Sequence, residues 1–353
     1  MKLPLLITNK YNLEYLIGFT GSSGFILMTK SKNYFFTDGR YLEIAKKLEK
    51  SKKKRVDFEF ILYDKDFKET WKSILKKHRI KSLYFESEDI TVQKFSSFKK
   101  LCGSKVKLKK TEHEIARFMR TMKDKKELKK IAQAQVIIEK VFKIIKKELK
   151  KGQTEREIAW RIKELCQKYG AQDISFEPIV AFGNHSASPH HQNTDRKLKK
   201  GDIVLIDHGA RFEGYCSDMT RMIFTKKPTE KEIEIYNTVL KAQLAGIDSI
   251  KAGMKASKVA KIARKVIEDA GYGENYTHSL GHGVGLDVHD PPTSLSIKSK
   301  CTLKEGMVVT IEPGIYLSGK FGVRIEDMGV VTKKGIKLFT KQPKQLKHCI
   351  KIL

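Results

Sequence analysis

Two stretches in the second half of the chain repeat one unusual pattern. They are DIVLIDHGARFEGYCSDMTRMIF, at residues 202–224, and MVVTIEPGIYLSGKFGVRIEDMGVV, at residues 307–331. Each is a β-like apolar run that ends in an acidic residue, then a turn containing glycine, then a second run that carries another acidic residue, which is typical of a β-hairpin. The repetition predicts two pseudo-symmetric halves around a shared site.

The acidic residues of each stretch are spaced so that they can face one another. If residues 211–214 form the turn of the first hairpin, Asp207 lies opposite Asp218. The same reasoning places Glu312 opposite Glu326 in the second hairpin. Directly opposed residues on one face of an antiparallel pair have β-carbons about 5 Å apart. Each hairpin therefore offers one pair of facing carboxylates.

Four carboxylates can converge in a core only if cations neutralise them, because unpaired they repel one another and lose their hydration. Two divalent metal ions satisfy this demand. His282, in the segment LGHGVGLDVHD at residues 280–290, supplies a fifth ligand, and the glycines beside it let the backbone approach closely. Oxygen-rich ligation with one imidazole suits manganese, iron(II) or cobalt better than a structural zinc.

The histidines gather in the same part of the chain. Seven of the ten lie between residues 185 and 289: His185, His190, His191, His208, His278, His282 and His289. A neutral imidazole beside a metal centre can orient substrate, stabilise a developing oxyanion or carry a proton. For His191 and His208 an exposed or structural role is the simpler interpretation, as a surface role is for any single strand-end acid. The joint pattern favours a metal site.

The first hundred residues alternate short β-like runs with helical ones, which predicts an α/β domain. A helix is expected from Tyr41 to Lys54, and a short charged helix over residues 109–123. A long amphipathic helix should begin at Asp124 and end at Gly152. A chain of 353 residues suits two domains, and we place them at residues 1–122 and 123–353.

The formal charge of +30 invites a nucleic-acid interpretation. The basic residues are scattered, however, without an aromatic RNA-binding signature or a recognition helix, so no specific nucleic-acid partner is expected. Five cysteines with no CxxC pair indicate neither disulfides nor a thiolate zinc site. No apolar stretch is long enough for a membrane span or a signal peptide, so we expect a cytoplasmic protein without membrane contact.

Residues from about 123 onward resemble the pita-bread metallopeptidases, which include methionine aminopeptidase, aminopeptidase P and prolidase. The motifs that carry this resemblance are IDHGARFEGYCSDMTR, LGHGVGLDVHD, IEPGIY and GVRIEDMGVV, in the family's order. The resemblance implies a pita-bread catalytic domain with pseudo-two-fold symmetry. Near the N-terminus, YLIGFTGSSG and TDGRY resemble the creatinase-type α/β domain of aminopeptidase P and prolidase, which methionine aminopeptidases lack.

The resemblance also implies roles for individual residues. One metal ion would be bound by Asp207 and Asp218, and the other by Asp218, Glu326, Glu312 and His282, with a hydroxide bridging the two. Glu312 would act as general base. His190 and His289 match histidines that contact the scissile peptide, and His278 and Arg324 look like supporting residues. Manganese is the expected metal, with cobalt, iron(II) or zinc as alternatives.

The implied activity is that of an Xaa-Pro aminopeptidase, which releases the N-terminal residue from peptides with proline in second position. A bond to proline has no amide hydrogen, so it calls for a dedicated enzyme. The alternative is an Xaa-Pro dipeptidase, or prolidase, which is restricted to dipeptides. A third hypothesis is a non-catalytic binding module on the same fold, although such relatives typically lack ligands that are complete here. Relatives also suggest a homodimer.

Overall fold

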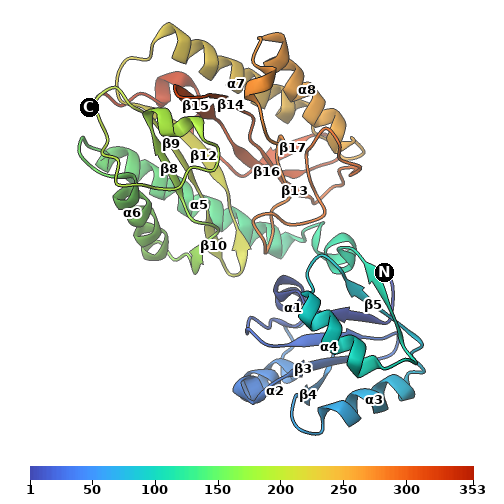
Figure 1. The fold of residues 1–353 in the computed structure, drawn as a ribbon. Helices are drawn as coiled ribbons and strands as arrows, with labels where there is room; N and C mark the ends of the chain where they lie inside the picture. Colours follow the sequence, from blue (N-terminus) through green and yellow to red (C-terminus); the bar gives the residue numbers. More distant parts are fainter. The chain divides into compact units, whose positions relative to one another are not determined.

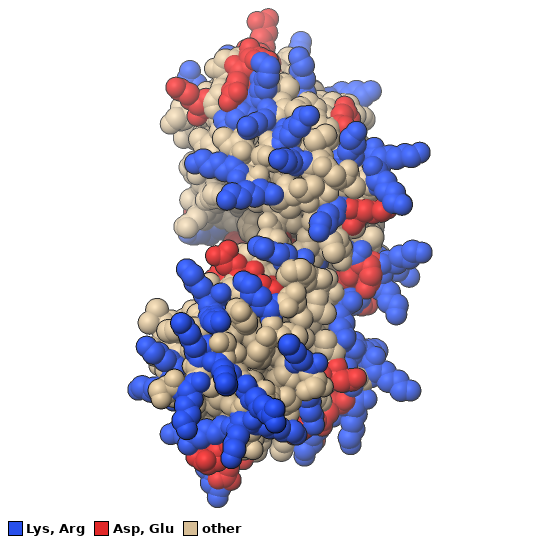
Figure 2. Space-filling view, turned by 90° about the vertical axis from the view of Figure 1, so that its right-hand side faces the viewer, with Lys and Arg blue, Asp and Glu red and all other residues tan.

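A computed structural model describes all of residues 1–353, which divide into two compact units, Met1–Arg120 and Thr121–Leu353 (Figure 1). Both units combine helices with β-sheets, as the sequence predicts. None of the helices combines the length and the apolar character that a membrane span requires. Lys and Arg side chains are dispersed over the face shown in Figure 2, with acidic residues between them, rather than gathered in one stripe.

The first unit is built on a mixed six-stranded sheet in the order β4-β3-β2-β1-β5-β6. Its strands are β1 (Leu5–Ile7), β2 (Phe25–Met28), β3 (Asn33–Thr37), β4 (Glu59–Leu62), β5 (Ser82–Glu86) and β6 (Lys107–Thr111). Its helices are α1 (Lys10–Ile17), α2 (Leu42–Lys50), α3 (Phe67–Lys77) and α4 (Val92–Cys102). Fully buried Trp71 of α3 lies in the core among side chains of β2, β3 and α4, including Phe36 and Phe98.

Two expectations for this unit are wrong in detail. Helix α2 ends at Lys50, earlier than predicted, because Ser51 leaves the helical conformation and its hydroxyl accepts a hydrogen bond from the Lys53 amide. The charged helix expected over residues 109–123 is replaced by the end of β6 and a turn of π-helix over Ala116–Arg120. Residues up to Thr111 instead extend the sheet by pairing in parallel with β5, so tertiary pairing overrides the local charge pattern.

The second unit contains two halves, each with a pair of helices and a group of strands (Figure 1). The first half contains α5 (Lys125–Glu148), α6 (Glu155–Lys168), β7 (Asp173–Ile174), β8 (Ile179–Phe182), β9 (Ile203–His208), β10 (Ala210–Phe212), β11 (Tyr215–Cys216) and β12 (Met219–Phe224). The second contains α7 (Glu230–Ser249), α8 (Ala256–Asp269), β13 (Val308–Ile311), β14 (Gly314–Leu317), β15 (Phe321–Arg324), β16 (Asp327–Val331) and β17 (Ile336–Leu338).

Apolar side chains fix these halves against each other. On one face of the β12-β9-β8 sheet, side chains such as Val204 and Ile223 pack against α5 and α6. On the opposite face, Leu205 and Met222 pack against α7 and the β14–β15 pair. Because successive residues of a strand point to opposite faces, β9 and β12 are buried on both sides. Asp207, the acidic residue of β9, is therefore held in a rigid and buried setting.

Three helices of the second unit begin at a residue whose side chain caps them. Asp124 accepts hydrogen bonds from the amides of Lys126 and Glu127, and the Glu127 carboxylate accepts one from the Asp124 amide, which completes a capping box at the start of α5. The long helix expected from Asp124 is confirmed, although it ends at Glu148, before the expected Gly152, because Leu149 already leaves the helical conformation. Thr154 and Thr229 cap α6 and α7 in the same reciprocal way.

Replacing the cap of α7 should weaken the second unit measurably. Thr229→Ala removes the hydroxyl that accepts from the Glu232 amide, and we expect the free energy of unfolding to fall by about 1 kcal/mol. Urea unfolding followed by circular dichroism measures this loss. Thr238→Ala is the matched control, because the Thr238 hydroxyl only donates to the Glu234 carbonyl within the same helix. An equal loss in both variants would contradict the capping role.

Candidate metal centre

All nine candidate site residues line a single cavity of about 390 Å³ in the second unit. They are His190, Asp207, Asp218, His278, His282, His289, Glu312, Arg324 and Glu326. The residues come from both hairpins, from the loop after β8 and from the glycine-rich segment before β13. The structure therefore brings together side chains that lie up to 136 residues apart in sequence.

The register of the first hairpin differs from the prediction. Asp207 lies opposite Thr220, not Asp218, because the turn contains only Glu213 and Gly214, both with positive φ. The turn is displaced by one residue, so each partner shifts by two. A shift of two keeps every side chain on its face of the sheet. Asp218 occupies the break between β11 and β12 and still lines the cavity.

The second hairpin has the register that the sequence predicts. Ile311 pairs with Asp327, and Gly314 pairs with Arg324. Both pairs belong to one continuous register, which sets Glu312 opposite Glu326 in the interval between the strands. The two hairpins therefore place four carboxylates at the cavity, as expected. Only in the second hairpin do the two acidic residues lie directly opposite each other.

A hydrogen-bond network that the sequence did not reveal holds the carboxylates in place. The Thr220 hydroxyl donates to Glu326 Oε2 at 2.8 Å and accepts from Arg324 Nε at 3.0 Å. Arg324 Nη2 donates to Asp207 Oδ2 at 2.7 Å, and Nη1 donates to the Tyr316 hydroxyl at 2.9 Å. The sequence analysis missed Thr220 and Tyr316 because threonine and tyrosine are not typical metal ligands. Only the correct strand register, which pairs Thr220 with Asp207, could have indicated Thr220.

Three carboxylate oxygens in this cluster are buried without any hydrogen-bond partner. They are Asp207 Oδ1, Asp218 Oδ1 and Glu326 Oε1. An unsatisfied buried acceptor is costly, and an unsatisfied buried charge is more costly still. Three such atoms in residues that line one cavity fit divalent cations, because these ions bind carboxylate oxygens.

His282 presents the nitrogen that a metal ion would need. Its Nδ1–H donates to the Gly283 carbonyl at 3.1 Å, which leaves Nε2 directed at the acids. Nε2 lies 3.2 Å from Glu312 Oε1 and 3.6 Å from Asp218 Oδ2. This outer hydrogen bond fixes the ring as in many metal-binding histidines. A Cβ on Gly281 would lie 2.0 Å from the Thr310 carbonyl oxygen, so glycine is needed for the close approach.

The pKa values of the clustered carboxyl groups are shifted by burial and by their mutual repulsion. Burial, reinforced by the charges of neighbouring carboxylates, raises the pKa values of Asp207, Asp218 and Glu326 above their ordinary range. Burial would also raise the pKa of Glu312, but the hydrogen bond and the charge of His282 bring it down to about 2. The same contact raises the pKa of His282 against the effect of burial. Without cations, the cluster must hold protons instead.

The histidines other than His282 lie in different surroundings. His278 Nε2 lies 2.9 Å from the Tyr316 hydroxyl, and burial lowers the pKa of His278. The His289 ring centroid lies 4.1 Å from that of His282, and burial also lowers the pKa of His289. His190 is exposed at the cavity. His208 is fully buried outside it, where burial lowers its pKa to about 4, in line with the structural role expected for it.

The sequence of this chain matches two known protein-family profiles. The sequence profile described as metallopeptidase family M24 matches residues 129–333, which is more than half of the chain. The chain belongs to metallopeptidase family M24. A second profile, the creatinase/prolidase N-terminal domain, matches residues 4–120. This M24 protein therefore has the pita-bread fold with a creatinase-type N-terminal domain, and membership of a metallopeptidase family implies divalent metals.

Named relatives of this M24 protein align along almost its whole length. It is 38% identical over 346 residues to a protein named Xaa-Pro dipeptidase from Pyrococcus horikoshii, covering 97% of this chain and 93% of the relative. The solved structure of an Xaa-Pro dipeptidase from Bacillus anthracis matches with a TM-score of 0.90 and 37% identity, covering 98% and 94% of the two chains. An X-Pro aminopeptidase structure from Thermotoga maritima matches with a TM-score of 0.86 and 35% identity, covering 99% and 97%.

The ion-free protein should become less stable as the pH rises. The pKa values of Asp207, Asp218 and Glu326 are about 4 in the unfolded chain and higher in the folded one, so for these three groups the folded state binds more protons. Their stabilising contribution is complete below about pH 4 and is lost as the pH rises through the folded values. His282 acts in the same direction.

Thermal unfolding of EDTA-treated protein at about pH 6 and about pH 8 measures this effect. We expect the lower melting temperature at the higher pH, and a larger gain from added Mn²⁺ there, because metal ions replace the protons. A melting temperature that rises with pH in the ion-free protein would contradict the account.

Proposed function

We propose that this M24 protein is a metal-dependent Xaa-Pro dipeptidase that hydrolyses the bond between an N-terminal residue and a following proline. The observation that carries the proposal is that the complete set of nine site residues lines one cavity, in a chain that aligns end to end with proteins named Xaa-Pro dipeptidase. The sequence alone favoured an aminopeptidase acting on longer peptides. The relatives support the alternative, and we adopt it.

The size of the cavity agrees with a short substrate. A volume of about 390 Å³ lies near the lower end of the range for small-molecule sites. The second candidate, an Xaa-Pro aminopeptidase for longer peptides, is supported by the likeness to the Thermotoga maritima enzyme. The proposed dipeptidase and this alternative share the metal centre and differ only in how far the peptide extends beyond proline.

The proposed metal ligands are Asp207, Asp218, His282, Glu312 and Glu326. We propose two divalent ions, most suitably Mn²⁺, because four carboxylates and one imidazole form an oxygen-rich set. When bound, such ions polarise the scissile carbonyl and make a water molecule a nucleophile at neutral pH. The three buried oxygens without partners support this ligand set independently of the relatives.

The remaining groups would handle the substrate and its protons. Glu312, kept ionised beside His282, is the candidate to accept a proton from the attacking water. His289 is exposed to the cavity, and partial desolvation together with the charge of His282 lowers its pKa, so it can donate an N–H to the carbonyl oxygen as negative charge develops there. Exposed His190 can contribute a second donor. These are proposed catalytic residues.

Two further residues would position the site. Arg324 donates to Asp207 and to the Pro189 carbonyl, so it connects a proposed ligand to the loop that carries His190. His278 supports Arg324 through the Tyr316 hydroxyl. Among the carboxylates of the proposed centre, Asp207 is the candidate to lie beside the free α-amino group of the substrate. An enzyme that binds this group acts only at the N-terminus of a peptide.

A peptide panel tests the proposed specificity. We expect Gly-Pro and other Xaa-Pro dipeptides to be cleaved in Mn²⁺ with higher kcat/KM than Arg-Pro-Pro or longer Xaa-Pro peptides. EDTA should abolish all cleavage, and added Mn²⁺ should restore it. Cleavage of the longer peptides with little action on dipeptides would instead establish the aminopeptidase. Absence of metal binding together with absence of cleavage would indicate a binding module.

Removing one proposed ligand tests the centre itself. Asp218→Asn keeps the size of the side chain but removes charge and ligand strength, so we expect activity to fall by at least about 10³-fold, comparable to the loss of about 4 kcal/mol of transition-state stabilisation. Bound metal per chain should fall as well. Asp248→Asn on the exposed face of α7 is the matched control. Full activity in the Asp218 variant would contradict the ligand assignment.

A further inference from the structure

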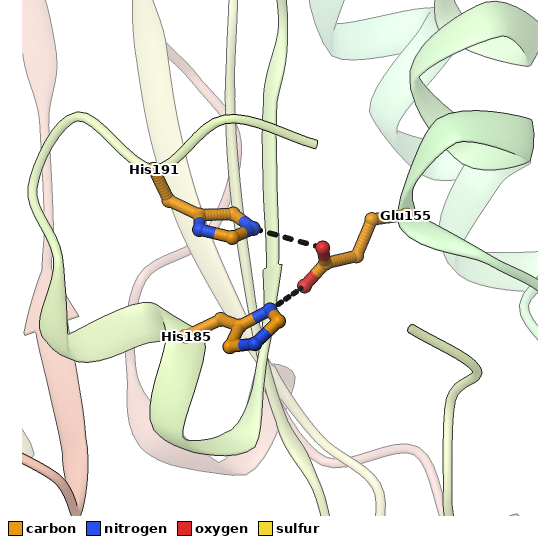
Figure 3. A group of neighbouring side chains, drawn as sticks. All are labelled: Glu155, His185 and His191. Atoms are coloured by element: carbon orange, nitrogen blue, oxygen red, sulfur yellow. Dashed lines mark hydrogen bonds and ion pairs between the residues drawn. The ribbon is translucent and has the colours of Figure 1, made fainter. Parts of the chain in front are cut away.

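A second cluster of ligand-type side chains lies outside the cavity of the metal centre (Figure 3). It consists of Glu155 in the first turn of α6, His185 in the short helical turn after β8, and His191 in the loop that follows. His185 Nδ1 lies 2.9 Å from Glu155 Oε1, and His191 Nε2 lies 2.8 Å from Glu155 Oε2. Two imidazoles and one carboxylate thus converge from three separate segments, with one ligand atom of each within 4.8 Å of the others.

The carboxylate of this cluster is deeply buried and firmly oriented. Glu155 is 0% exposed, and it also accepts hydrogen bonds from the Phe182 amide at 2.9 Å and from the amide and hydroxyl of Thr194 at 3.0 and 2.7 Å. Burial would raise the pKa of Glu155, but the hydrogen bonds from His191, Thr194 and Phe182 outweigh it and keep the group ionised. Three of these donors do not involve an imidazole, so they would remain if an ion replaced the imidazole protons.

The imidazoles are reachable from solvent although the carboxylate is not. The side chain of His185 is 29% exposed and that of His191 is 11% exposed. Their ring centroids lie 4.5 Å apart, on the same side of the Glu155 carboxylate in Figure 3. A small cation can therefore enter from the side of the rings. A carboxylate held by outer hydrogen bonds and faced by two accessible imidazoles has the organisation of a metal site.

We propose that Glu155, His185 and His191 bind a third divalent ion of the zinc class, separate from the carboxylate-rich centre. Two imidazoles with one carboxylate form a ligand set that zinc uses with water in the fourth position. Ligand atoms of a tetrahedral zinc site lie about 3.3 Å apart, so each imidazole nitrogen, now 2.9 or 2.8 Å from a carboxylate oxygen, would withdraw from that oxygen by about half an ångström. Each neutral imidazole carries its proton on the outer nitrogen when the inner one binds the ion.

Occupancy of this site would stabilise a segment that the metal centre also uses. The loop between His185 and His191 contains Pro189, whose carbonyl accepts from Arg324 Nη1 at 3.2 Å, and proposed catalytic His190. Ser186 in the same loop accepts from the Gly322 amide at 3.0 Å. An ion held by Glu155 ties both ends of this loop to the start of α6. Binding of zinc here is therefore coupled to the order of the His190 loop.

Zinc counting tests the site directly. Chelator-stripped protein is dialysed against micromolar free Zn²⁺, and zinc per chain is measured by mass spectrometry. We expect the double variant His185→Asn and His191→Asn to bind one zinc fewer than the unchanged protein. The double variant His113→Asn and His348→Asn is the matched control, because it removes the same number of imidazoles outside both sites and should keep the full count.

The comparison is repeated with Asp218→Asn in every chain. A difference of one zinc between cluster and control variants should persist there, so the result does not depend on the proposed peptidase function. Equal zinc counts in folded cluster and control variants would overturn the proposal. If the cluster variant does not fold, anomalous diffraction from zinc-soaked crystals of the unchanged protein decides. A zinc peak between Glu155, His185 and His191 supports the site, and its absence overturns it.

Discussion

Mutual repulsion among four converging carboxylates is the constraint on which the second unit depends. Asp207, Asp218, Glu312 and Glu326 line one cavity, and three of them retain a buried oxygen without a partner. Protein side chains compensate only part of this charge, through Arg324 at Asp207 and His282 at Glu312. The two hairpins, packed rigidly between helix pairs, hold the acids in place against this repulsion. The arrangement is explained if cations complete it, because ions then supply the missing attraction.

The same rigidity links the metal centre to its surroundings. Arg221 and Asp327, which follow Thr220 and Glu326 directly, form a buried ion pair at 2.6 Å, and Arg221 is 1% exposed. Arg221 also donates to the Glu326 carbonyl, so the backbone that carries this proposed ligand is fixed from behind. A buried pair of this kind contributes geometry more than net stability. It keeps the acids in position whether or not ions are bound.

The proposed metal centre could be predicted from the sequence because clustered acidic residues are rarely buried in a core unless they bind a metal ion or take part in catalysis. Four acids and a histidine near glycines indicated metal binding before any fold was known. The register of the first hairpin could not be predicted, since it depends on whether the turn contains Glu213 and Gly214 alone, and each residue of displacement moves the partner by two. The error left the face unchanged, so Asp218 still reached the cavity.

Other features depend on tertiary contacts that no local pattern contains. Glu155 is separated from His185 and His191 by 30 and 36 residues, and one acid at a helix start looks like an ordinary first-turn residue. The proposed substrate length likewise rests on the likeness to named relatives and not on particular residues.

Whether two ions share the acids of the main centre is tested most directly by electron paramagnetic resonance of Mn²⁺-loaded protein. The account predicts an exchange-coupled pair at two ions per chain, and an uncoupled spectrum that saturates at one ion would contradict it.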